Sequence, residues 1–144
     1  MSVKVAVRVR PFNEREMGRN PKCCIKMNGP QTIIVDQEGK ERPFTFDYSF
    51  QSHDDFYVDE NGVSKPSSPD STYADQSYVY DVLGKQVLDN AWAGYHCCLF
   101  AYGQTGSGKS YSMVGYGKNQ GIVPMACNEI FRRIKDNKDP NNSF

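Results

Sequence analysis

The chain has 144 residues, of which 38% are hydrophobic, 24% charged and 12% aromatic, and its formal net charge is zero. This length suggests one domain or part of one, and the composition is that of an ordinary globular protein. The balanced charge gives no support to a nucleic-acid or membrane partner, and no apolar run approaches membrane-spanning length. The five cysteines do not match zinc-site spacing, and without a signal-peptide pattern they predict reduced thiols in an intracellular protein.

The first ten residues carry the period-two pattern of a β-strand. Apolar and basic side chains alternate over residues 3–10, so that one face would hold the valines and be buried. Pro11 ends this strand because proline has no N–H to donate to a ladder. Residues 13–20 are polar, and we expect a surface loop or a short helical turn there.

A small antiparallel meander is predicted next, followed by a long exposed loop. Short strand-like runs alternate with glycine-containing turn signals, which is the pattern of consecutive hairpins. The expected strands are 24–27, 32–35 and 42–46, with turns at 28–30 and 38–40 and an aromatic segment packing on the core at 47–50. Residues 51–74 are acidic and then rich in proline and serine, which predicts a long loop insertion.

A helix is predicted over residues 75–93. Asp75 can cap its N-terminus, and Gly94 suits the left-handed position that follows many helices. Apolar side chains recur at helical spacing and would face the core rather than a ligand. They are Tyr80, Leu83, Val87 and Ala91, with Val79, Leu88 and Trp92 beside them.

The strongest motif is Gly103-Gln104-Thr105-Gly106-Ser107-Gly108-Lys109-Ser110, which fits the phosphate-binding pattern G-x-x-x-x-G-K-[S/T] at every specified position. Its glycines allow a tight turn whose N–H groups point inward and form an anion site. Lys109 would place a positive charge on the β- and γ-phosphates, and Ser110 would place its hydroxyl on Mg²⁺. The apolar run 97–102 predicts a buried strand before the loop, and a helix is expected after it, as the motif requires.

Glycines 115, 117 and 121 interrupt this helix soon after the loop. A new helix is expected with Pro124 in its first turn and an end near residues 135–137. Its apolar face would hold Cys127, Ile130, Phe131 and Ile134. A turn is expected at 139–142, and a strand would begin at 143–144.

Two separated motifs resemble the kinesin motor domain family. Residues 5–12 (VAVRVRPF) are similar to its opening strand, and residues 100–113 (FAYGQTGSGKSYSM) are similar to its phosphate loop and following helix. The segments 46–48, 93–95 and 121–124 also fit. The resemblance covers almost the whole chain, and in detail it is most like the kinesin-3 class of organelle transporters.

This resemblance implies an α/β phosphate-loop NTPase fold, the kinesin motor fold, with a central mixed sheet and helices on both faces. Residues 1–144 would be the N-terminal part of that motor domain. The resemblance implies ATP with Mg²⁺ as ligands, microtubules as the partner, and a location in the cytoplasm on the cytoskeleton. A tail outside this chain would bind cargo or a membrane organelle, and no nucleic-acid partner is expected.

By the same resemblance, Arg8, Arg10 and Pro11 would lie at the adenine end of the nucleotide site. The chemistry is sensible, because a proline ring and a guanidinium plane can flank a base. The residues alone favour another interpretation, in which both arginines only solvate the exposed face of a strand. Tyr111, directly after the loop, either contacts the nucleotide or packs against its neighbours.

No catalytic residue is assigned. Phosphoryl transfer also needs a group that positions water and a second hold on Mg²⁺. Kinesins resemble other switch NTPases in providing these after the loop, in a serine- and arginine-rich segment and an Asp-x-x-Gly segment, and neither occurs in the 34 residues after Ser110. Two Asp-x-x-Gly matches, at 59–62 and 81–84, precede the loop and are assigned to chance.

Three functions fit these patterns. The first is a microtubule motor ATPase, of which this chain is the N-terminal piece and is inactive alone. The second is a truncated nucleotide-binding or interaction module without catalysis. The third is an unrelated phosphate-loop ATPase or GTPase, against which residues 8–11 and the lead-in 100–105 argue.

Overall fold

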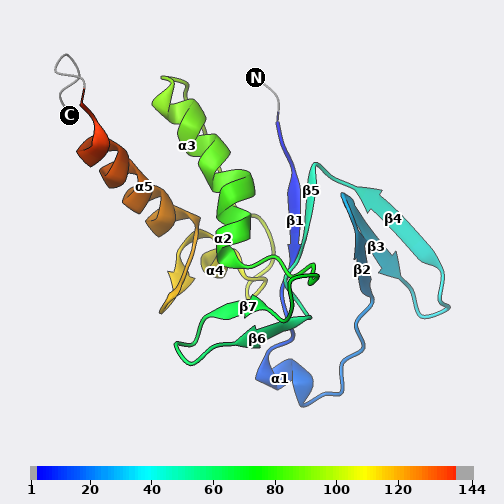
Figure 1. Ribbon diagram of the computed structural model, residues 1–144. Coiled ribbons are helices and arrows are strands. Elements are labelled where there is room, and N and C mark those ends of the chain that lie inside the picture. The colour runs from blue at the N-terminus through cyan, green and yellow to red at the C-terminus, as the bar shows by residue number, and fades with distance from the viewer. Residues whose placement is uncertain (1–2, 139–144) are drawn as a thin grey trace. The chain divides into compact units, whose positions relative to one another are not determined.

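The computed structural model describes residues 3–138, and the chain divides into two units (Figure 1). The first unit is Met1–Tyr57 with Lys65–Ala74, and the second is Val58–Ser64 with Asp75–Phe144. The turn and strand expected at 139–142 and 143–144 lie outside the described residues.

A parallel strand pair carries the opening motif in the first unit. β1 (Ala6–Val9) pairs with β5 (Tyr48–Gln51), so that Ala6 lies opposite Tyr48 and Val9 opposite Gln51. The observed strand β1 is therefore shorter than the predicted strand 3–10, because its partner β5 spans only four residues. Val3 is 87% exposed, whereas Val7 and Val9 are half-buried, so the expected burial holds only where β5 covers the strand.

The antiparallel meander is confirmed. β2 (Ile25–Asn28), β3 (Gln31–Val35) and β4 (Glu41–Thr45) form a sheet in the order β2-β3-β4. Pro43 lies on the edge strand β4, where its missing N–H costs no interior ladder bond. The buried hydroxyl of Thr32 bonds with that of Ser49 at 3.0 Å, which ties the meander to β5.

The segment 51–74 is more ordered than the sequence predicts. It contains β6 (Phe56–Val58) and β7 (Ser64–Pro66), which pair with each other. Its two ends are buried in the first unit, at Ser52 and at Tyr73 and Ala74. The Tyr73 ring stacks on Phe56 with centroids 4.8 Å apart, so these two aromatic side chains pack against each other, whereas Tyr57 is 50% exposed.

One continuous helix, predicted as 75–93, opens the main part of the second unit. It consists of α2 (Gln76–Val79), a π-turn η1 (Tyr80–Gly84) and α3 (Lys85–Trp92), and the Asp75 carboxylate caps it by accepting from the Tyr78 N–H at 2.7 Å. At the other end the N–H groups of Gly94 and Tyr95 donate to the carbonyls of Ala91 and Asn90. This is a Schellman ending with Gly94 at φ +89°, as the glycine predicted.

The buried strand predicted at 97–102 is wrong for this chain. These residues belong to no strand, and Phe100 and Tyr102 are 79% and 96% exposed. A strand requires a neighbouring strand for its N–H and C=O groups, and none within residues 3–138 pairs with this segment. The apolar pattern therefore indicates a preference for burial, which no strand within the described residues satisfies.

After the phosphate loop come α4 (Lys109–Met113), the hairpin of β8 (Gly115–Tyr116) and β9 (Asn119–Gln120), and α5 (Ile122–Asp136). The two helices were predicted, and the hairpin between them was not. The expected apolar face of α5 is only partly correct. Ile130 and Ile134 are half-buried, but Cys127 is exposed and Phe131 is 70% exposed. The face of α5 that packs on η1 and β9 is therefore not the face predicted from the sequence.

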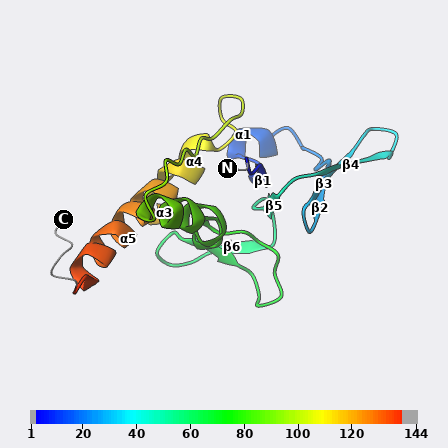
Figure 2. The same ribbon diagram turned by 90° about the horizontal axis from the view of Figure 1, so that it is seen from above.

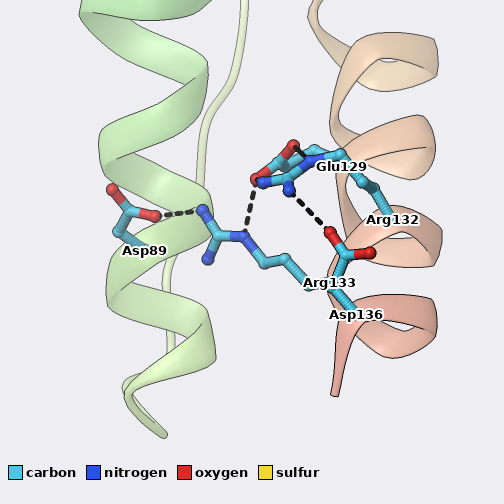
Figure 3. Close-up of polar contacts among 5 residues, drawn as sticks. All are labelled: Asp89, Glu129, Arg132, Arg133 and Asp136. Carbon is cyan, nitrogen blue, oxygen red and sulfur yellow. Dashed lines mark hydrogen bonds and ion pairs between the residues drawn. The ribbon is translucent and has the colours of Figure 1, made fainter. Parts of the chain in front are cut away.

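A cluster of charged side chains joins α3 and α5, which lie side by side in Figures 1 and 2. Arg133 of α5 pairs with Asp89 of α3 and donates to Glu129 at 2.9 Å (Figure 3). Its guanidinium also lies 5.4 Å from the Trp92 ring centre. Arg132 also pairs with Glu129, and these arginine hydrogen bonds lower the pKa of Glu129 to about 2. Arg133 is the member that connects the two helices.

Replacing Arg133 with methionine is expected to lower the melting temperature by roughly 5 °C, because it removes the interhelical ion pair and the contact with Trp92. Arg132→Met is the matched control, since Arg132 is 61% exposed and pairs only along α5, with Glu129 and Asp136. Thermal unfolding followed by circular dichroism measures both. Equal shifts for the two variants would show that the interhelical pair adds nothing.

Within residues 3–138, no helix combines the length and the apolar character needed to cross a membrane. All five cysteines are free and exposed.

Candidate functional site

The phosphate loop has the backbone conformation that its glycines predict. Gly103, Gly106 and Gly108 have φ values of +152°, +82° and +97°, which side chains with a Cβ rarely adopt. At Gly103 a Cβ would also lie 2.5 Å from the Ser107 hydroxyl oxygen. The Ser107 N–H donates to the Gln104 carbonyl at 3.1 Å, which closes the turn. The loop is thus built where only glycine fits.

Lys109 closes this loop from its C-terminal end. Its ammonium donates to the carbonyl oxygens of Gly103 at 2.7 Å and Gln104 at 2.8 Å. Lys109 and Ser110 form the first turn of α4, whose first internal hydrogen bond comes from the Ser112 N–H to the Gly108 carbonyl. The positive charge of Lys109 therefore lies against the backbone at the beginning of the loop.

The loop residues fit a nucleoside triphosphate with a divalent cation. Positive-φ glycines leave the backbone open to a polyphosphate, and the exposed Ser110 follows Lys109 directly. Residues 3–138 contain no group of three metal-ligating side chains. Mg²⁺ in nucleotide sites is bound by few protein groups together with phosphate oxygens and waters, and the Ser110 hydroxyl is placed to be one of those groups.

Arg8 is a structural member of the first unit. Its Nε donates to the Ser52 hydroxyl at 2.9 Å and its Nη2 to the Ala74 carbonyl at 3.3 Å, and the Ser52 hydroxyl itself donates to that carbonyl. The interpretation that Arg8 only solvates an exposed strand face is therefore wrong. The guanidinium holds both ends of the segment 52–74 against β1.

Arg10 is fixed by the carboxylate of Glu16, a contact that was not predicted from the sequence. Its two terminal nitrogens donate to Glu16 at 2.7 and 2.8 Å, and one also donates to the Pro11 carbonyl at 2.7 Å. The Arg10 hydrogen bonds lower the pKa of Glu16 to about 2. Glu16 also accepts from the Asn13 N–H, completing the capping box of α1 (Glu14–Met17). The spacing Asn13-x-x-Glu16 was the signal in the sequence.

Tyr111 packs within the second unit. Its ring is half-buried and lies 6.1 Å from that of Tyr116 in β8, centre to centre. The site residues thus fall into two groups. Arg8, Arg10 and Pro11 belong to the first unit, and residues 103–111 belong to the second.

Comparison with known proteins agrees with these features. A family model described as the kinesin motor domain matches residues 8–144. The chain is 51% identical to Kinesin-like protein KIF28 of Rattus norvegicus over 140 residues, covering 96% of this chain and 14% of that protein. It is 48% identical to Kinesin-like protein KIF1A of the same species over 148 residues, covering 99% of this chain and 8% of that protein.

A solved structure of a KIF14 segment, with ADP and in complex with a microtubule, is also similar. It superimposes with a TM-score of 0.80 at 38% identity, covering 96% of this chain and 35% of that one. The α/β fold class predicted from the sequence is confirmed by this likeness. The resemblance to the kinesin-3 class is confirmed as well, because the relatives include kinesin-3 members. The chain spans about a third of the KIF14 segment and less of the curated relatives.

Proposed function

Since this chain belongs to the kinesin motor domain family, we propose that it carries the ATP-binding part of a microtubule motor. The observation that carries the proposal is the loop 103–110, with left-handed glycines and Lys109 folded over its backbone. The protein containing it would couple ATP hydrolysis to movement along microtubules.

Each loop residue has a separate task in this proposal. Lys109 supplies positive charge to the β- and γ-phosphates, and Ser110 supplies an oxygen to Mg²⁺. The glycine turn supplies backbone N–H groups without side chains in the way. The bound nucleotide supplies the transferable phosphoryl group, and these residues hold and orient it.

Arg8, Arg10 and Pro11 contribute the adenine end of the site in this proposal. Arg10 is held by the Glu16 carboxylate and donates to the Pro11 carbonyl, and Arg8 is held by Ser52 and Ala74. A fixed guanidinium plane loses little further freedom when it stacks on a base. Tyr111, directly after the loop, is proposed to contact the nucleotide, and its ring lies 6.1 Å from that of Tyr116.

Microtubules are the proposed partner, supported by the KIF14 structure, which is in complex with a microtubule. The proposed location is the cytoplasm, on the cytoskeleton, and cargo would be bound by a tail outside this chain. Water positioning and the second hold on Mg²⁺ are assigned to residues outside 1–144, because phosphoryl transfer requires them and neither a serine- and arginine-rich segment nor an Asp-x-x-Gly segment occurs in the 34 residues after Ser110.

A gliding assay tests this proposal. The full-length native protein, fixed to a glass surface, is expected to move microtubules with ATP and to hold them without movement with a non-hydrolysable analogue. Phosphate release should rise when microtubules are added. Nucleotide binding without movement or stimulated phosphate release would reject the motor and leave a nucleotide-binding module. No nucleotide binding would reject the loop assignment itself.

A further inference from the structure

A buried amide connects three segments of the second unit behind the phosphate loop. Gln76, the first residue of α2, is 7% exposed. Its Nε2 donates to the backbone carbonyl of Tyr111 in α4 at 2.7 Å and to that of Asn119 in β9 at 3.2 Å. Both acceptors are carbonyl oxygens, so the amide nitrogen must face them and both of its hydrogens are used.

The Tyr111 carbonyl needs such a donor. α4 has five residues, and the last carbonyls of a helix have no partner within it. The Ser110 carbonyl is satisfied by the Val114 N–H at 2.8 Å, and the Tyr111 carbonyl is satisfied by Gln76. A helix of one turn is not stable by itself, so its orientation depends on contacts such as this one.

Asn119 extends the connection to the turn between β6 and β7. Its side chain accepts from the Ser64 N–H at 2.9 Å and donates to the Gly62 carbonyl at 2.6 Å, while its own carbonyl accepts from Gln76. The Asp59 carboxylate in turn accepts from the N–H groups of Asn61 and Val63 and stiffens that turn. The Asn119 carbonyl that accepts from Gln76 therefore belongs to a residue whose own side chain is fixed by two hydrogen bonds.

We propose that Gln76 is a positioning residue for nucleotide binding, acting through the carbonyl of Tyr111 to set the orientation of α4. Lys109 lies two residues before Tyr111 and Ser110 lies one residue before it, so a rotation of this single turn moves both of them. Displacements of about 1 Å at such groups are enough to reduce binding or catalysis greatly. This proposal rests on the proposed function of the loop 103–110.

The test compares three variants of the full-length native protein by titration with a fluorescent ATP analogue and Mg²⁺. Gln76→Leu keeps the approximate size and removes both donors, and affinity is expected to fall about tenfold or more. Gln86→Leu is the matched control, the same change at an exposed position of the same continuous helix, and affinity should stay within about twofold. Melting temperatures are measured in parallel.

Gln76→Glu separates positioning from loss of fold. Its carboxylate offers no donor at neutral pH, and its protonated form offers one to the Tyr111 carbonyl. Because position 76 is buried, the introduced carboxyl should have a raised pKa and become protonated as the pH falls from about 7.5 to 5, so affinity relative to the unsubstituted protein at each pH is expected to recover over that range. This variant also carries the test if Gln76→Leu does not fold.

Two results would overturn the proposal while the loop assignment stands. One is nucleotide affinity in Gln76→Leu equal to that of Gln86→Leu, and the other is a weakened Gln76→Glu protein with no recovery at low pH. Failure of the proposed function looks different, because the unsubstituted protein itself would not bind the nucleotide.

Discussion

Replacing Lys109 with alanine is expected to weaken ATP binding by about a hundredfold or more. The change removes the positive charge proposed to bind the phosphates, and hydrogen bonds to charged groups each contribute about 1.5–3 kcal/mol. It also removes the two hydrogen bonds from Lys109 to the carbonyls of Gly103 and Gln104. The loop then loses both its ligand contact and its closure. Calorimetric titration with ATP and Mg²⁺ measures the loss.

Lys85→Ala is the matched control for this variant. Lys85 is an exposed lysine at the start of α3, so the same substitution changes the net charge equally without touching the loop. Its affinity is expected to stay within about twofold of the unsubstituted protein. Unchanged ATP affinity in Lys109→Ala would remove the phosphate-loop assignment, whatever the control shows.

Replacing Gly115 with alanine is expected to lower the free energy of unfolding by about 3 kcal/mol or more and to disrupt the hairpin of β8 and β9. Gly115 has φ +82°, and a Cβ there would lie 1.9 Å from the Asn119 carbonyl oxygen and 2.5 Å from the Gly121 nitrogen. These are backbone atoms of the facing strand and of the start of α5, so no side chain can move aside. Urea unfolding followed by circular dichroism measures the cost.

Gly117→Ala distinguishes the clash from the backbone conformation alone. Gly117 also has a positive φ, +56°, but a Cβ there meets no atom within 4 Å. Its cost is expected to be about 1 kcal/mol, the usual penalty for a left-handed alanine. If both variants cost the same, the close approach in the hairpin is not what requires glycine at position 115.

Local signals in the sequence predicted the structure well. The loop 103–110 is defined by glycines whose conformations depend on the residues themselves, and its geometry is confirmed. The helix 76–92 follows from periodicity, with Asp75 and Gly94 marking its two ends as expected. In each case the information lies within a few residues along the chain.

Features that depend on distant contacts were not predicted. The apolar run 97–102 has the composition of a buried strand, but a strand exists only beside another strand. The two-residue strands of the hairpin were hidden because Gly115 and Gly117 read as breaks in a helix. Gln76 left a weak trace, a polar residue on the stripe of Val79, Tyr80 and Leu83, which indicates a buried amide with specific partners.

The unpaired backbone of residues 97–102 has a kinetic consequence, because this segment enters the phosphate loop directly. Its order must come from residues distant in sequence, and contacts of large sequence separation form late and slowly during folding. Residues 97–102 should therefore reach their final structure after the helices α3 and α4 on either side have formed. The thiols of Cys97 and Cys98, both exposed now, make that late step observable as a falling rate of alkylation during refolding of the native protein.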